Sequence, residues 1–263
     1  MEKKYKLTDE TINLNGVTLY RIEALKDFGE IKKGDKGGFI ESENNLAHEG
    51  NAWVSDDACV YDNARVSGNA RVYGSAHLCG NACVYDYTRV CDNARVCGNA
   101  RVYNHACVHG DAWLDDNARV YDNAWVSGNG QVYGNARVYG SAHLCGNACV
   151  YDNAHVSDNA KVYNNACVHG DARVYRDALV RGYACVCGDA EISNKPDYIV
   201  FQNWWSSGRY FTWTRSNNMW SVGCFYGTGE ELIKKAYKDS ELSGREYERI
   251  VKYVEEIRKD NGK

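Results

Sequence analysis

The chain has 263 residues, with 31 Lys and Arg, 35 Asp and Glu, 12 Cys and a formal net charge of −4. This charge excludes a general attraction to nucleic acid or anionic membranes, so we expect neither as a partner. No stretch approaches the roughly 18 apolar residues of a membrane span, and the N-terminus lacks the apolar core of a signal peptide. We therefore expect a cytoplasmic protein with reduced thiols.

Residues 1–44 are predicted to form an N-terminal β cap. Val17–Ile22 has the composition of a strand, and Gly34–Ile40 is typical of a turn that leads into a repeated structure. Aliphatic and small residues then follow at a spacing of six, at Leu46 and Ala52. An open solenoid exposes unpaired strand edges, and a cap of this kind covers them.

From Asn51 to Asn194 the sequence divides into 24 consecutive six-residue repeats without an insertion. The fourth position is always aliphatic, and the second is Ala except at Thr88 and Gly130. Positions two and four are one strand period apart and share a face, whereas positions three and five point outward. The sixth and first positions are mostly Gly, Asp, Asn or Ser, which favour corners. We therefore predict an all-β solenoid over residues 45–194.

Segments such as Val72–His77 (Val-Tyr-Gly-Ser-Ala-His) resemble the bacterial transferase hexapeptide repeat, in which an aliphatic residue is followed four positions later by a small one. The resemblance implies a left-handed parallel β-helix, a triangular prism with three repeats per coil. The 24 repeats would then form about eight 18-residue coils, and residues eighteen apart would stack on one face. The chain looks most similar to uncharacterised hexapeptide-repeat proteins of phages and Gram-positive bacteria.

Residues 195–263 are predicted to form a small α+β domain with three strands and two helices (β3α2). Thr228–Glu231 and Ser243–Glu246 both fit the capping box that opens a helix. We interpret four closely spaced tryptophans as a small aromatic core, with a ligand platform as the alternative. The predicted strands are Tyr198–Phe201, Arg209–Thr214 and Met219–Tyr226, and the tryptophans are Trp204, Trp205, Trp213 and Trp220.

One face of the predicted prism carries a column of arginines beside a column of tyrosines. Five of the eight arginines at position three fall on this face. Guanidinium groups and phenol rings are favoured contacts for proteins and for anions, so we expect a protein partner, a second copy of the chain or an anionic small ligand. The alternative is that both residue types simply occupy outward strand positions. The candidate binding residues are Arg101, Tyr103, Arg119, Tyr121, Arg137, Tyr139, Arg173 and Tyr175.

The resemblance also implies a second hypothesis, an acyl-CoA-dependent acyltransferase with a catalytic His and a site between subunits. The repeats contain no insertion to wall such a site, and the histidines occupy corner or outward positions without an identifiable acidic partner. We therefore predict no catalytic residue, no metal ligand, and no cofactor except acyl-CoA under this alternative. Eleven cysteines lie outward in the repeats, where Cys149, Cys167 and Cys185 form a ladder, and we interpret them as free thiols.

The sequence thus favours a non-enzymatic interaction protein, a rigid prism that presents its faces and its C-terminal module to a partner. The resemblance to phage proteins implies a role in blocking or sequestering a host component. Proteins of this superfamily are commonly trimers, and Trp53, Trp113 and Trp125 are expected on the surface. We therefore expect a homotrimer or a homodimer.

Overall fold

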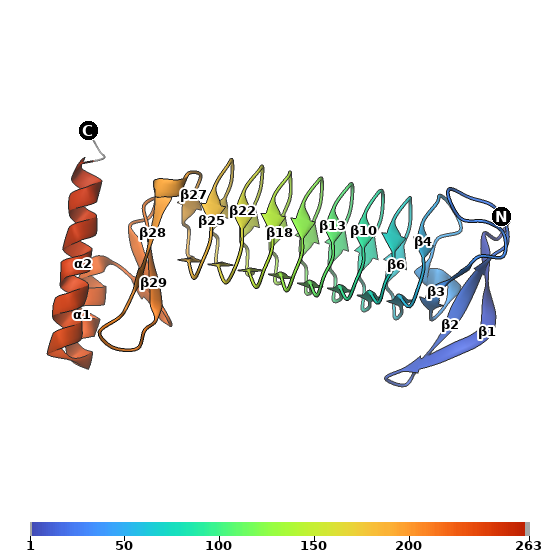
Figure 1. The fold of residues 1–263 in the computed structure, drawn as a ribbon, viewed down its shortest axis with the longest axis horizontal. Helices are drawn as coiled ribbons and strands as arrows, with labels where there is room; N and C mark the ends of the chain where they lie inside the picture. Colours follow the sequence, from blue (N-terminus) through green and yellow to red (C-terminus); the bar gives the residue numbers. More distant parts are fainter. Residues whose placement is uncertain (1, 261–263) are drawn as a thin grey trace.

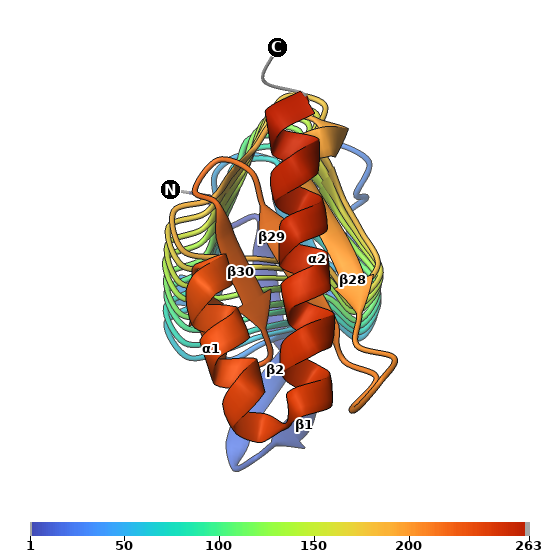
Figure 2. The same ribbon diagram turned by 90° about the vertical axis from the view of Figure 1, so that its left-hand side faces the viewer.

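A computed structural model describes residues 2–260 as an elongated rod with three successive parts (Figure 1). An N-terminal β cap lies at one end, regular coils form the middle, and a sheet with two helices lies at the other end. Viewed along the rod, the coils superimpose into a three-sided outline (Figure 2). Helices α1 (Gly229–Asp239) and α2 (Glu241–Asp260) lie across the end of this prism. Within residues 2–260, no helix has both the length and the apolar character that a membrane crossing requires.

The N-terminal cap extends one face of the prism. Strands β1 (Tyr5–Leu14) and β2 (Val17–Ala24) form an antiparallel hairpin, and β3 (Lys36–Ile40) pairs with β2 on one side. On its other side β3 pairs in parallel with β5 (Cys59–Val60), the first strand of that face in the coils. The strand predicted at Val17–Ile22 is confirmed, whereas β1 is an additional strand. A short 3-10 helix, η1 (Glu43–Asn45), leads from β3 into the regular coils.

Trp53 is buried because the cap covers it, so the prediction that it is exposed is wrong. Its side chain is 3% exposed, and its ring packs edge-on against Phe28 at 5.4 Å and against Tyr5 at 6.3 Å. Trp113 and Trp125 lie farther along the prism, beyond the cap, and are 47% and 48% exposed as predicted.

Each six-residue repeat contributes a two-residue strand followed by a corner. Each of these strands pairs in parallel with the corresponding strand of the next coil, 18 residues later, up to the last coil, as in the pairing of Arg101 with Arg119. The predicted period and the three-sided prism are confirmed. Leu46 forms a parallel bridge with Val66, so a less regular turn precedes the eight regular coils and gives about nine turns in total. The left hand stays a prediction from the resemblance.

We name two of the three faces by their outward residues and the third by a groove that it contains. The Cys-rich face comprises β5 (Cys59–Val60), β8 (His77–Leu78), β11 (Arg95–Val96), β14 (Trp113–Leu114), β17 (Gln131–Val132), β20 (Cys149–Val150), β23 (Cys167–Val168) and β26 (Cys185–Val186). The groove face comprises β4 (Trp53–Val54), β7 (Arg71–Val72), β10 (Arg89–Val90), β13 (Cys107–Val108), β16 (Trp125–Val126), β19 (His143–Leu144), β22 (Lys161–Val162) and β25 (Leu179–Val180). The Arg–Tyr face comprises β6 (Arg65–Val66), β9 (Cys83–Val84), β12 (Arg101–Val102), β15 (Arg119–Val120), β18 (Arg137–Val138), β21 (His155–Val156), β24 (Arg173–Val174) and β27 (Glu191–Ile192).

The core of the prism is a thin aliphatic column. The residues at positions two and four of the repeat are buried throughout, in one continuous cluster that also takes in Tyr5 and Ile22 of the cap. Short strands need sharp corners, and position six adopts positive φ from Asp56 to Gly188. Gly and Asp dominate there because Gly lacks a Cβ and Asp can hydrogen bond locally. The Asp56 carboxylate, for example, accepts the Gly74 N–H of the next coil at 2.9 Å.

The C-terminal domain has four strands, not the predicted three. The strands are β28 (Tyr198–Gln202), β29 (Tyr210–Thr214), β30 (Met219–Val222) and β31 (Phe225–Gly227), and they follow the 3-10 helix η2 (Lys195–Asp197). The segment predicted as one strand, Met219–Tyr226, folds into a hairpin because Gly223 and Cys224 form a turn, with Gly223 at φ 57°. The domain is therefore β4α2, and its predicted residues 261–263 lie outside the described part of the chain.

The first of the two predicted helix caps is confirmed and the second is wrong. Thr228 Oγ1 accepts the Glu231 N–H, and the Glu231 carboxylate accepts the Thr228 N–H at 2.8 Å. Helix α2 begins at Glu241, two residues before Ser243, because Ser240 Oγ accepts the Ser243 N–H at 3.1 Å.

The aromatic core predicted for the C-terminal domain is present in part. Trp213 and Trp220 are fully buried between the sheet and the helices, and Trp205 packs partly buried against the same cluster. Trp204 does not belong to it, since its side chain is 75% exposed.

Candidate functional site

The predicted arginine column lies in register on the Arg–Tyr face. Arg101, Arg119 and Arg137 are Cα partners in consecutive coils, and all three side chains are exposed. Within residues 2–260, none of the three has a carboxylate within the 4.0 Å of an ion pair. The face therefore presents three guanidinium groups whose donors are open to a ligand.

The tyrosines beside them form a continuous stack. The rings of Tyr85, Tyr103, Tyr121 and Tyr139 lie 5.1, 4.8 and 5.0 Å apart in sequence, with planes within 2° of parallel. Partial burial raises the pKa of Tyr103 and of Tyr121, so both phenols stay protonated at neutral pH and can donate hydrogen bonds. The stack limits the motion of each ring, which lowers the entropy that a partner must overcome.

Arg173 and Tyr175 lie on the same face but are separated from the other predicted residues. The intervening coil carries His155 and Ser157, which interrupt both columns. The His155 ring meets Tyr139 edge-on at 6.2 Å, and Arg173 approaches Glu191 at 4.0 Å. A shallow hollow of about 470 Å³ lies at this interruption. The structure therefore groups six of the eight predicted residues and leaves the other two beside the hollow.

The groove face contains a shallow groove of about 710 Å³, lined among others by Arg89, His105, His109 and Trp125. His109 Nδ1 lies 3.7 Å from an Asp92 carboxylate oxygen. The expectation that the histidines lack an acidic partner is wrong here, because a corner Asp in one coil lies next to the position-five side chain of the following coil. The same 17-residue offset brings Asp152 to 3.7 Å from His169 Nδ1.

Cysteines concentrate on the Cys-rich face, which carries seven of the chain's 12. Cys79 and Cys97, which we interpreted as free thiols, are joined by a disulfide. Both occupy position five in neighbouring coils, with Cα atoms 4.6 Å apart, within the range that a disulfide requires. The predicted ladder of Cys149, Cys167 and Cys185 is confirmed by their strand pairing.

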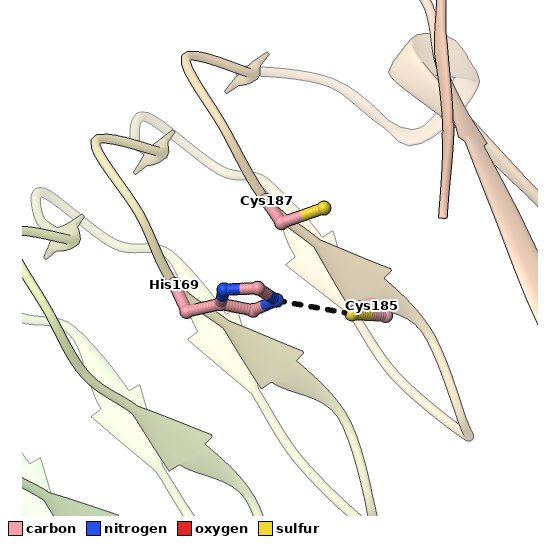
Figure 3. Close-up of side chains that lie close together, drawn as sticks. All are labelled: His169, Cys185 and Cys187. Atoms are coloured by element: carbon pink, nitrogen blue, oxygen red, sulfur yellow. Dashed lines mark hydrogen bonds between the residues drawn. The ribbon is translucent and has the colours of Figure 1, made fainter. Parts of the chain in front are cut away.

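The end of that ladder forms a cluster with His169 and Cys187 (Figure 3). His169 Nε2 lies 3.4 Å from Cys185 Sγ, and the ligand atoms of His169, Cys185 and Cys187 all lie within 4.8 Å of one another. Two hydrogen bonds, of which the one with Cys167 has the larger effect and the one with Cys187 the smaller, hold the pKa of the Cys185 thiol far below its ordinary value. The ladder could be predicted from the sequence, whereas our sequence analysis missed the cluster, because its members come from two outward positions in two coils.

The neighbours of the cluster belong to the two previous coils and to the C-terminal sheet. Cys149 Sγ and Cys167 Sγ lie 2.8 Å apart, two coils and one coil before Cys185, respectively. The Cys185 N–H donates to Thr212 Oγ1 of β29 at 2.8 Å, and the Ser221 hydroxyl of β30 hydrogen bonds to the Cys185 thiol. The cluster thus lies where the last coil meets the C-terminal domain.

Comparison with known proteins finds one matching family model, described as the YdcK beta solenoid repeat, over residues 64–80, 94–110 and 131–146. No curated protein matches the chain. All three matched segments lie within the coils of the prism, and each spans nearly one 18-residue period. The match and the fold agree that this chain is a β-solenoid repeat protein.

Proposed function

We propose that this protein is a non-enzymatic binding protein whose Arg–Tyr face docks onto an acidic surface of a protein partner. The observation that carries the proposal is the set of three exposed guanidinium groups at Arg101, Arg119 and Arg137, which form no ion pair with any residue that the structure describes. Strands in a ladder lie about 4.8 Å apart, so like charges in consecutive coils repel one another. A strip of carboxylates with the same spacing relieves this repulsion and forms bidentate pairs.

The shape of the face favours a protein over a small ligand. The stacked rings and the arginines extend in register over consecutive coils, and neither Arg101 nor Arg119 lines the groove or the hollow at His155. Flat surfaces rich in Tyr and Arg are typical of protein interfaces, whereas small ligands bind in concave sites. The partner is therefore expected to span several coils.

The test compares two variants with the same change in net charge. In the first, Arg101, Arg119 and Arg137 are all changed to Glu. In the control, Arg89, Arg95 and Lys161, which lie on the other two faces, are changed to Glu. Immobilised wild-type protein and both variants capture partners from host lysate, and each candidate is then purified and its affinity is measured.

We expect the face variant to bind the purified partner at least about 100-fold more weakly, because arginines are enriched among hot-spot residues, whose truncation costs about 2 kcal/mol or more. The control is expected to bind like the wild type, and the wild-type affinity is expected to fall with salt. The proposal is overturned if the control loses binding to the same degree or the face variant retains it. The resemblance to phage proteins that we infer from the sequence directs the first search to host proteins.

Self-association is a separate part of the proposal. We expect a dimer or trimer of the 29.5 kDa chain, because Trp113 on the Cys-rich face and Trp125 on the groove face expose large apolar rings. Light scattering at micromolar concentration measures the mass. A monomer mass contradicts the predicted oligomer. If the wild type is an oligomer and the variant with the three arginines changed to Glu is a monomer, the Arg–Tyr face forms the contact between the subunits.

A second candidate function, acyl transfer from acyl-CoA, is favoured by one observation. His109 lines the groove and has a carboxylate of Asp92 beside Nδ1, an arrangement that orients an imidazole as a general base. Arg89 in the same groove offers a phosphate contact. Calorimetry with acetyl-CoA tests it: heat that disappears in His109→Gln supports this function, and no heat with the wild type refutes it.

A further inference from the structure

The last two coils bring three metal-ligating side chains to one point on the Cys-rich face (Figure 3). The ligand atoms of His169, Cys185 and Cys187 all lie within 4.8 Å of one another, and the contact from His169 Nε2 to Cys185 Sγ is 3.4 Å. With Zn–S bonds of about 2.3 Å and Zn–N bonds of about 2.0 Å, tetrahedral ligand atoms lie roughly 3.5 to 3.8 Å apart. Shifts of about 1 Å or less therefore bring all three to bonding distance of one ion.

Cys167 supplies a third thiol and thus a fourth ligand. It is the Cα partner of Cys185 in the previous coil, and the two thiols hydrogen bond to each other. Three thiolates and one imidazole are a donor set that selects zinc, which binds four such ligands in structural sites. Cys185 and Cys187 lie on one side of the same strand segment, so the backbone already holds half of the set.

The imidazole of His169 has the orientation that a metal ligand needs. Nε2 faces the thiol of Cys185, and on the opposite side of the ring Nδ1 lies 3.7 Å from Asp152. Carboxylates in this position fix the tautomer and the ring direction of metal-bound histidines. His109 has the same carboxylate geometry with Asp92, but its ring meets Trp125 edge-on at 6.1 Å.

The surroundings fit a closed structural site better than an open catalytic one. Cys187 is only 4% exposed, and no residue of the cluster lines the groove or the hollows at Tyr198 and Tyr247. Strand β26, which carries Cys185, is the last strand of its sheet, so one edge lacks a further strand. Thr212 covers part of that edge by accepting the Cys185 N–H.

We propose that Cys167, His169, Cys185 and Cys187 form a structural zinc site that fastens the terminal coil to the coil before it, at the junction with the C-terminal domain. Zinc displaces the thiol protons and forms three Zn–S bonds and one Zn–N bond, with no change of oxidation state. This inference goes beyond the proposed binding function and is independent of it, since the Arg–Tyr face contributes no ligand.

The test is a titration of the full-length chain with zinc ion alone. The protein is reduced, stripped with a chelator, and titrated against a chromophoric competitor, and cobalt is then substituted for zinc. We expect one zinc per chain, and thiolate-to-cobalt charge-transfer absorption in the cobalt form. Each variant is first checked for native far-UV circular dichroism, so that a loss of binding is not a loss of folding.

The variants separate this cluster from other thiols and imidazoles. Cys187→Ser and His169→Gln are each expected to weaken zinc binding at least about 100-fold, more than loss of an outer carboxylate usually costs. Matched controls are Cys145→Ser, which is at position five of another face, and His109→Gln, which has the same carboxylate contact. Both controls are expected to bind like the wild type.

Thermal unfolding gives a second readout, because a ligand that binds only the folded state raises the unfolding temperature. Zinc is expected to raise it for the wild type and for the Cys145→Ser control but not for Cys187→Ser. The proposal is overturned if the reduced wild type takes up no zinc above trace level, or if cluster and control variants lose affinity equally. It is also overturned if the cobalt form lacks thiolate absorption.

Discussion

The asparagine ladder at the first position of the repeat allows a sharp test of how corners hold neighbouring coils together. Asn117 Nδ2 donates to Asn135 Oδ1 at 3.1 Å, and Asn135 Nδ2 donates to Asn153 Oδ1 at 3.1 Å. Asn135→Ala removes both hydrogen bonds and interrupts the ladder. A hydrogen bond contributes about 0.5–1.5 kcal/mol, and exposed bonds fall at the low end because water competes. We therefore expect the variant to lose about 1–2 kcal/mol.

Asn123→Ala is the matched control. Asn123 is exposed at the same repeat position, and among residues 2–260 its side chain has no hydrogen-bond partner. Its loss is expected to change the stability by less than about 0.5 kcal/mol. Urea unfolding followed by far-UV circular dichroism measures both variants, with the slope as a check that the same surface is exposed. Equal shifts for the two variants would refute the reasoning, since the ladder would then add nothing beyond local propensity.

Three further predictions concern the core, the corners and pH. Leu114→Ala, in the fully buried column, is expected to lower the free energy of unfolding by about 2–5 kcal/mol, measured by urea unfolding. Arg176→Gly is expected to raise it by about 0.5–1 kcal/mol in the same assay, because Arg176 has φ 56° and Gly adopts this conformation without strain. Burial, with Arg137 and Arg173 nearby, lowers the pKa of His155 in the folded state. The unfolded chain therefore takes up that proton first as pH falls through about 6.5, so between pH 7.5 and 5.5 wild type should lose more thermal stability than His155→Gln.

The register of the prism could be predicted because the repeats contain no insertion. Once three repeats make one coil, residues eighteen apart must stack, and Arg101 pairs with Arg119 as this rule requires. The same rule shows where the columns of arginines and tyrosines are interrupted. His155 and Ser157 occupy the positions of an Arg and a Tyr in the column, and this one coil separates Arg173 from the arginines before it.

The wrong predictions concern segments whose local sequence pattern is compatible with two structures. Trp53 occupies an outward position, and its burial depends on a cap that comes from residues 48 positions earlier in the chain, such as Tyr5. Ser240 and Ser243 are both able to cap a helix, and the hydrogen bond from the Ser243 N–H selects Ser240. The hairpin at Gly223 breaks a segment whose β-forming residues alone predict one strand. In each case a contact made by the fold decides between local alternatives.

The cluster of His169, Cys185 and Cys187 shows what the 18-residue period predicts and what it does not predict. A position-five residue neighbours the residues 16 and 18 positions later, and this rule selects only two sets made wholly of Cys and His. They are His169, Cys185 and Cys187, and Cys91, Cys107 and His109.

Of these two sets, only the first converges within the described residues. In the second set, the Cys91 thiol hydrogen bonds to the Tyr73 hydroxyl of the preceding coil, and the His109 ring meets Trp125 edge-on at 6.1 Å. The converging set lies instead at the last coil, where Thr212 and Ser221 of the C-terminal sheet hold Cys185. The repeat therefore places the donors, and the docking of the C-terminal domain selects which donors meet.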